Sequence, residues 1–189
     1  IILGPGRDFF DTGTTTYVYD LDGTYEWRDL NQKVDAIAIG DNRIVLGVPT
    51  SGSLSSNRGR IYIYDLDGNL IANSDLGTET GALLGSDVAV GEGIIAATEP
   101  GRGSSATGKG SVHIFDLDGN LLTQIFPPRY VSTIGSDDFV FGTSVEIAHG
   151  RLYIAAERED TQGTDCGVIY VYDMDTFNLV YDSDTPPLI

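Results

Sequence analysis

Pairs of aspartates followed by a glycine are the residues of this chain that most directly suggest chemistry. The pattern Asp-x-Asp-Gly occurs three times, and its carboxylates are Asp20, Asp22, Asp65, Asp67, Asp116 and Asp118. A calcium loop of the EF-hand type opens in the same way, but it also needs a bidentate Glu at position twelve. That position is Asn31, Leu76 or Pro127 here. We therefore interpret the pattern as a tight turn, with a weak calcium site as the alternative and no other cofactor.

The residues on either side of each Asp-Gly pair predict a β-hairpin. In the second copy, β-branched and aromatic residues fill 61–64, and an apolar run follows the turn at 70–72. Asp-Gly between two such runs is a strong hairpin signal, because a tight primed turn needs a positive φ. Tyr62 and Tyr64 point to one face of the strand, and Ile61 and Ile63 to the other. Since both faces are apolar, we expect a sheet that is covered on both sides.

The hairpin belongs to a unit that the chain repeats. The stretch 19–23 returns at 64–68 and 115–119, and in degenerate form at 172–176, at a period of about 50 residues. The last three units each contain four short apolar segments, which predicts an all-β fold, a β-propeller of four-stranded antiparallel blades. We place the repeats at about 1–31, 32–76, 84–126 and 138–182, with a tail at 183–189.

The first repeat lacks the segment that forms the inner strand of the others. We therefore expect three full blades and one incomplete blade, within a single propeller domain or part of a larger propeller or assembly. An incomplete blade leaves an apolar face and an unpaired edge at residues 1–3. The expected partners are other polypeptide chains or further copies of this one, or residues that precede Ile1 in a longer polypeptide.

The stretch Phe141-Gly142-Thr143-Ser144-Val145, followed by the apolar run 151–156, resembles an FG-GAP repeat. Gly47-Val48-Pro49 is the nearest match to the Gly-Ala-Pro end of that motif. FG-GAP repeats build β-propellers in integrin-like adhesins and in many extracellular or virion proteins. The sequence of residues 59–70 also resembles that of repeat proteins encoded by marine bacteriophages. The resemblance implies a non-catalytic scaffold or adhesion module, structural or receptor-binding, at a virion or cell surface.

Strand alternation places all the long connections at one edge of the predicted sheets. These connections are polar and cover 5–14, 50–59, 76–83, 98–110, 127–137 and 157–167. Long loops on a rigid scaffold are where binding usually occurs, and a surface glycan or receptor is the expected ligand. The candidate ligand-binding residues are Asn57, Arg58, Arg102, Lys109, Asp137, Asp138, Arg158, Glu159 and Asp160. The alternative is that these connections are solvated spacers.

The sequence offers few combinations of residues that could form a catalytic site, and we predict no catalytic residue. The chain has two histidines, and His113 aligns with Tyr17, Tyr62 and Tyr170, which predicts an aromatic ring packed between blades. The paired carboxylates at 137–138 and 159–160 are the residues that a glycosidase would use. A glycan-processing enzyme is therefore the alternative function.

Charge and hydropathy exclude further classes. The formal net charge of −17 repels phosphate backbones, so we expect no nucleic-acid partner. No apolar run approaches the ~20 residues of a membrane span. Cys166 is the only cysteine, which rules out an internal disulfide.

Overall fold

The computed structural model describes residues 33–51, 57–75, 77–101, 110–128, 140–157 and 167–182, and the course of three strands before them. These parts of the chain form 15 β-strands, and none of their residues is helical. No helix long and apolar enough to cross a membrane is found among them.

The strands form four antiparallel sheets, each made of consecutive strands. Sheet I contains β1 (Ile2–Arg7), β2 (Thr14–Tyr19) and β3 (Tyr25–Asp29). Sheet II contains β4 (Ala36–Gly40), β5 (Arg43–Val48), β6 (Arg60–Tyr64) and β7 (Leu70–Asn73). Sheet III contains β8 (Val88–Gly91), β9 (Ile94–Glu99), β10 (Ser111–Asp116) and β11 (Leu121–Ile125). Sheet IV contains β12 (Val140–Ala148), β13 (Arg151–Glu157), β14 (Val168–Asp173) and β15 (Leu179–Asp182). The prediction of an all-β fold with four-stranded antiparallel sheets is confirmed.

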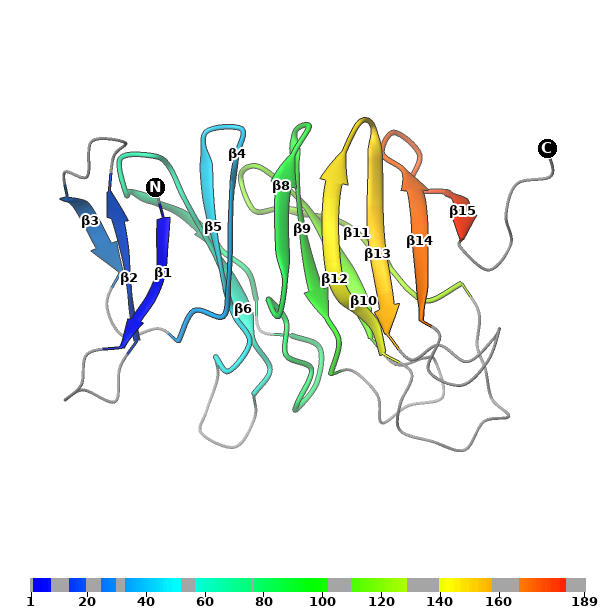
Figure 1. The fold of residues 1–189 in the computed structure, drawn as a ribbon, viewed down its shortest axis with the longest axis horizontal. Helices are drawn as coiled ribbons and strands as arrows, with labels where there is room; N and C mark the ends of the chain where they lie inside the picture. The colour runs from blue at the N-terminus through cyan, green and yellow to red at the C-terminus, as the bar shows by residue number, and fades with distance from the viewer. Residues whose placement is uncertain are drawn as a thin grey trace.

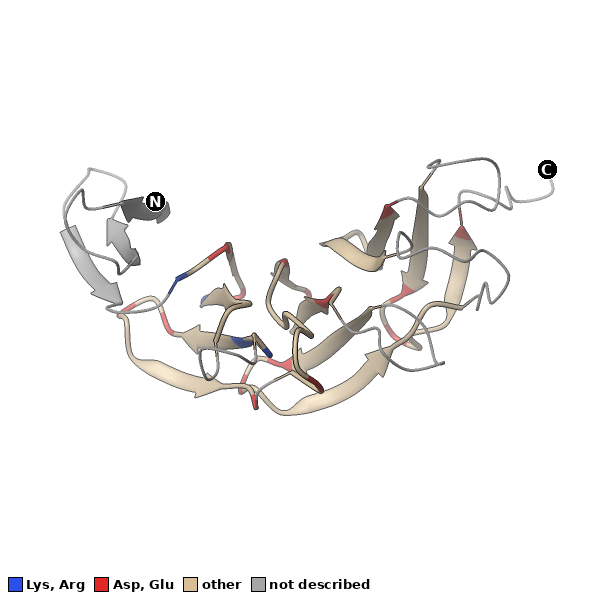
Figure 2. Ribbon diagram, turned by 90° about the horizontal axis from the view of Figure 1, so that it is seen from below, with Lys and Arg blue, Asp and Glu red and all other residues tan. Residues whose placement is uncertain are grey.

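The sheets follow one another along the molecule in chain order (Figure 1). The first strands of the complete sheets lie together, because β8 contacts both β4 and β12. Viewed from below, sheets II to IV form a crescent (Figure 2). The arrangement is that of a propeller-like fold in which β4, β8 and β12 are the inner strands.

Apolar side chains fill the spaces between neighbouring sheets. Val45, Ile61 and Ile63 of sheet II pack against Ile95 and Phe115 of sheet III. The opposite face of sheet III packs against sheet IV through a larger cluster that includes Ala96, Val112, Ile114, Leu152, Ile154 and Tyr170. Sheet III is therefore covered on both faces, which explains why its central strands carry no solvent-exposed face.

The rings that the repeat alignment placed between blades have different burial. His113 is 7% exposed and Tyr170 is fully buried, as predicted. Tyr62 is only half-buried, which corrects the expectation for that ring. It lies on the face of sheet II turned away from sheet III, with the Arg60 guanidinium 5.9 Å from its ring centre. The side chain of Tyr17 lies outside the described residues.

The turns between the first two strands of each complete sheet fix the register of the repeats. Each turn has two residues with positive φ: Asp41-Asn42, Glu92-Gly93 and His149-Gly150. A primed two-residue turn requires this backbone conformation. Gly93 therefore belongs to the turn, and β9 begins at the next residue, Ile94.

Candidate functional site

The two edges of the sheets differ in character. The two-residue turns and the described Asp-x-Asp turns lie at the upper edge in Figure 1, and residues 77–83, between sheets II and III, lie at the lower edge. Of the nine predicted ligand-binding residues, Asn57 and Arg58 are within the described residues. The others, which lie outside them, are Arg102, Lys109, Asp137, Asp138, Arg158, Glu159 and Asp160.

Asn57 and Arg58 lie where two long connections meet. Asn57 is exposed, and its carbonyl accepts a hydrogen bond from the Leu83 amide at 3.2 Å. The Arg58 guanidinium donates through Nε to the Gly77 carbonyl at 2.6 Å. The Arg58 carbonyl accepts from the Leu84 amide at 2.9 Å. Arg58 thus fastens the connection between β5 and β6 to the one between sheets II and III.

A buried polar cluster lies next to this junction, and sequence reasoning did not predict it. Its centre is the fully buried carboxylate of Glu99, at the end of β9. Oε1 accepts from the amide of Thr78 at 2.5 Å and from its hydroxyl at 3.0 Å. Oε2 accepts from Ser111 Oγ at 2.9 Å and lies 3.1 Å from His113 Nε2. Gln124 completes the cluster, with Nε2 2.9 Å from Ser111 Oγ.

The electrostatics of Glu99 follow from these contacts. Burial alone raises the pKa of this carboxyl, because a low-dielectric surrounding disfavours the charged form. The hydrogen bonds from His113, the Thr78 amide and Ser111, together with the charge of His113, outweigh burial and hold the pKa below its ordinary value of 4.5. Glu99 is therefore a carboxylate that the fold keeps ionised.

Ser111, His113 and Glu99 bring together the residue types of a catalytic triad without its geometry. In a triad the serine bonds to the histidine, and the histidine bonds to the acid through its other nitrogen. Here Ser111 Oγ and His113 Nε2 both lie against the same oxygen of Glu99. The three side chains are also buried. The cluster holds Thr78, and with it the connection between sheets II and III, against sheet III.

The sequence does contain a signal for this cluster, which appears when equivalent strand positions of the three complete sheets are compared. Glu99 occupies the position that Val48 has in sheet II and Ala156 in sheet IV. A carboxylate at a position that is apolar in the other repeats marks a buried charge that needs partners.

The Asp-x-Asp turns use their first aspartate to hold the turn together. Asp116 Oδ1 accepts from the Asn120 amide, and Oδ2 from its side-chain amide, both at 2.8 Å. Asp65 makes the same two bonds with Asn69, at 2.8 and 2.9 Å. These bonds from Asn69 and Asn120 lower the pKa of Asp65 and of Asp116.

The second aspartates of these turns, Asp67 and Asp118, are exposed. Asp20 and Asp22 lie outside the described residues. No group of three or more His, Cys, Asp or Glu side chains that could hold a metal occurs in the part of the chain that the structure describes.

Polar contacts also join neighbouring sheets at equivalent positions. The Gly93 amide donates to Asp41 Oδ2 at 2.7 Å, and the Gly150 amide donates to Glu92 at 2.9 Å. Each first turn residue therefore accepts from the turn of the following sheet. Asp87 Oδ2 makes a further link from sheet III to sheet IV, because it accepts from Ser144 Oγ at 2.7 Å and from the Val145 amide at 2.9 Å.

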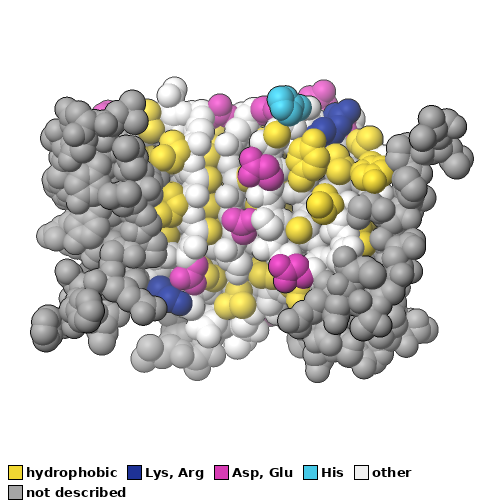
Figure 3. Space-filling view, viewed as in Figure 1, with side chains coloured by type: hydrophobic (Ala, Val, Ile, Leu, Met, Phe, Trp, Pro, Cys, Tyr) yellow, Lys and Arg dark blue, Asp and Glu magenta, His cyan; other side chains and the backbone are white. Residues whose placement is uncertain are grey.

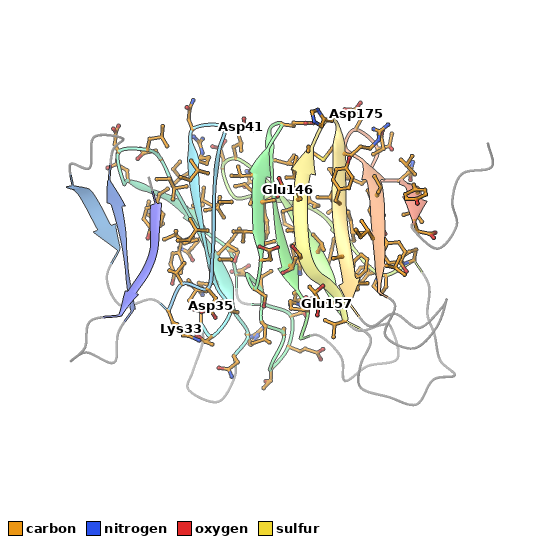
Figure 4. All side chains as sticks on the ribbon, viewed as in Figure 1. Lys33, Asp35, Asp41, Glu146, Glu157 and Asp175 are labelled. Atoms are coloured by element: carbon orange, nitrogen blue, oxygen red, sulfur yellow. The ribbon has the colours of Figure 1, made fainter. Side chains whose placement is uncertain are left out.

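The concave face carries acidic side chains in its middle and apolar ones towards sheet IV (Figure 3). Asp35, Glu146 and Glu157 lie on this face, on or beside the inner strands and β13 (Figure 4). Asp35 pairs with Lys33 at 3.5 Å, an exposed contact of small energy. No described residue forms an ion pair with Glu146 or Glu157.

Comparison with known proteins supports the fold and leaves the function open. Neither a scan against protein-family models nor a search of curated proteins finds a match. Among solved structures, the computationally designed protein Ika4 is 16% identical at a TM-score of 0.50, over 81% of this chain and 73% of that one. A quinohemoprotein alcohol dehydrogenase from Pseudomonas putida is 15% identical at a TM-score of 0.61, over 95% of this chain.

The chain spans 31% of the length of that dehydrogenase. The dehydrogenase contains a propeller, so the similarity supports a propeller-like fold for sheets I to IV. At this level of identity the similarity concerns the fold alone.

Proposed function

We propose that this chain is a non-catalytic scaffold or adhesion module whose four sheets are consecutive blades of a β-propeller. Three blades are complete and the first lacks its inner strand, which makes the chain part of a larger propeller or assembly. Its role is that of a structural or receptor-binding component of a virion or cell surface. A surface glycan or receptor binds through the long connections.

The observation that carries this proposal is the set of contacts that join neighbouring sheets at both edges. Asp41 and Glu92 link successive turns at one edge, and Arg58 links two connections at the other. Contacts of this kind make a rigid framework with short turns on one side and long polar loops on the other. Such a framework presents loops for binding without needing a catalytic centre. The FG-GAP resemblance of residues 141–145 points in the same direction.

The test combines a binding assay with an activity assay on the same ligands. The purified chain is applied to an array of immobilised glycans, and the same glycans in solution are assayed for released reducing ends. We expect saturable binding without release. A variant in which an Asn-Gly turn replaces residues 158–166 should keep its melting temperature and lose binding. The matched control, Asp67→Ala in an exposed turn at the other edge, should bind as the parent does.

Two results would contradict the proposal. Release of reducing ends that is abolished by Glu159→Gln or Asp160→Asn would identify a glycan-processing enzyme. Failure to bind any glycan, or binding that does not change when residues 158–166 are shortened, would remove the assigned role of the long connections.

A further inference from the structure

The face of sheet IV that points away from sheet III is equivalent in position to the faces that form the interfaces inside the molecule, but its side chains are more exposed. Val112 and Ile114 of sheet III, which face sheet IV, are fully buried, as are Ile61 and Ile63 of sheet II, which face sheet III. The strand register places Ile169 and Val171 of β14 at the equivalent positions. Ile169 is 50% exposed, and Val171 is half-buried.

The neighbouring strand completes this surface. Tyr153 pairs with Val171, and Ala155 pairs with Ile169, so the four side chains share one face of sheet IV. Tyr153 and Ala155 are half-buried, whereas Val45 of sheet II and Ala96 of sheet III, the counterparts of Tyr153, are fully buried. We call Tyr153, Ala155, Ile169 and Val171 the terminal face. Its composition and position continue the interfaces between sheets II and III and between sheets III and IV.

The contacts of Arg43 inside the molecule indicate what kind of surface would pack against the terminal face. In sheet II, Arg43 donates through Nε to the carbonyl of Leu117 at 2.9 Å, and its Nη2 lies 3.5 Å from Asp118. Leu117 and Asp118 belong to the Asp-Leu-Asp-Gly turn of sheet III. Arg43 therefore binds the Asp-Leu-Asp-Gly turn of the following sheet. This contact helps to set the position of sheet III relative to sheet II.

Arg151 is the equivalent residue of sheet IV, because both arginines begin the second strand of their sheet. Each of them also donates through Nη1 to the carbonyl of the preceding turn residue, Asn42 or Gly150. Arg151 Nη1 further contacts Asp173 at 2.7 Å. Within the described residues, Nε and Nη2 of Arg151 have no acceptor, although the corresponding atoms of Arg43 are the ones that reach the next sheet.

We propose that the terminal face binds sheet I of a second copy of this chain, head to tail. In this contact Arg151 binds the Asp-Leu-Asp-Gly turn of that sheet I. Sheet I carries this turn as Asp20-Leu21-Asp22-Gly23 in the sequence, so Asp22 stands where Asp118 stands in sheet III. An acidic turn meets an arginine beside an apolar patch, which matches the internal interface in charge and in hydropathy. A head-to-tail contact of this kind builds a ring or a filament, depending on whether the rotation closes.

This inference rests on the proposed scaffold role and is tested by mass rather than by ligand binding. Analytical ultracentrifugation of residues 1–189 over a wide concentration range should show species heavier than the 20.2 kDa chain, in whole multiples of its mass. Val171→Asp should raise the dissociation constant at least tenfold, on the order of what one buried charge in an apolar contact costs. Leu122→Asp, at an exposed apolar position on the outer strand of sheet III, is the matched control and should leave association unchanged.

A charge exchange tests the geometry separately from folding. Arg151→Glu and Asp22→Arg should each weaken association, and the double variant should restore it, because the pair is rebuilt with its signs reversed. A monomer at all concentrations would overturn the inference, as would an oligomer that neither Val171→Asp nor Arg151→Glu weakens, or a double variant without restoration. A monomer that still binds glycans without cleaving them would overturn this inference alone and leave the proposed function standing.

Discussion

The carboxylate of Glu99 links the pH of the medium to the stability of the junction between sheets II and III. Its pKa is lowered in the folded protein, so its contribution to the free energy of unfolding is present above the unfolded pKa of about 4.5 and is lost as the pH falls through the folded pKa. We expect Glu99→Gln to cost about 1–3 kcal/mol at pH 7, the range for leaving a buried donor or acceptor without its hydrogen bond. The difference between parent and variant should shrink progressively when denaturant unfolding is repeated at lower and lower pH, starting from 4.5. A difference that stays constant or grows in acid would contradict the assigned role of Glu99.

Aromatic residues at aligned positions should contribute unequally to stability. Tyr170 is fully buried against Phe141, with ring centres 5.6 Å apart, whereas Tyr62 is half-buried. Tyr170→Ala should therefore cost about 3–5 kcal/mol, as truncation of a core aromatic does. Tyr62→Ala, the matched control at the same repeat position, should cost distinctly less. Equal costs in urea unfolding would show that the repeat position, rather than the burial of each ring, sets the contribution.

At the scale of elements, the Asp-x-Asp turns are hairpin connections that their own side chains close. Since Asn120 donates to both oxygens of Asp116, Asp116→Ala should lower the melting temperature. Asp67→Ala, at an exposed turn position, is the control and should change it little. Excess chelator should also leave the melting temperature nearly unchanged. A chelator-induced drop of more than ~10 °C would be a ligand-sized effect and would favour calcium at Asp20, Asp65 and Asp116.

The close approach of sheets II and III depends on Gly47 in β5. A Cβ at this position would lie 2.1 Å from the carbonyl oxygen of Gly85. Because this oxygen is a backbone atom, it cannot avoid the clash by a change of rotamer. Gly47→Ala should therefore destabilise the protein by about 1–3 kcal/mol through overpacking. Ala155 is the equivalent residue of sheet IV, at the terminal face. Ala155→Gly should cost less than about 1 kcal/mol, the usual effect of glycine in a strand. Thermal unfolding of both variants measures the contrast.

For the whole molecule, the sequence predicts the sheets well because the information is local and repeated. Apolar residues on both strand faces, with Asp-Gly or two-residue turns between them, specify hairpins wherever they occur. The Glu99 cluster was missed because Thr78, Glu99 and Ser111 meet only through tertiary packing. Periodicity carries no information about such contacts.

The acidity of the whole chain makes its association sensitive to salt. Two copies that each carry a formal charge of −17 repel each other over a Debye length, which falls from about 30 Å at 0.01 M salt to about 3 Å at 1 M. The terminal face is apolar at its centre, so burial of Tyr153 and Val171 is not weakened by screening, whereas the repulsion between the net charges of two copies is. We therefore expect the dissociation constant for self-association to fall as salt rises from about 0.05 to 0.5 M. Ultracentrifugation at several salt concentrations measures this trend. Weaker association at high salt would show that attraction between charges, rather than burial of the terminal face, holds the copies together.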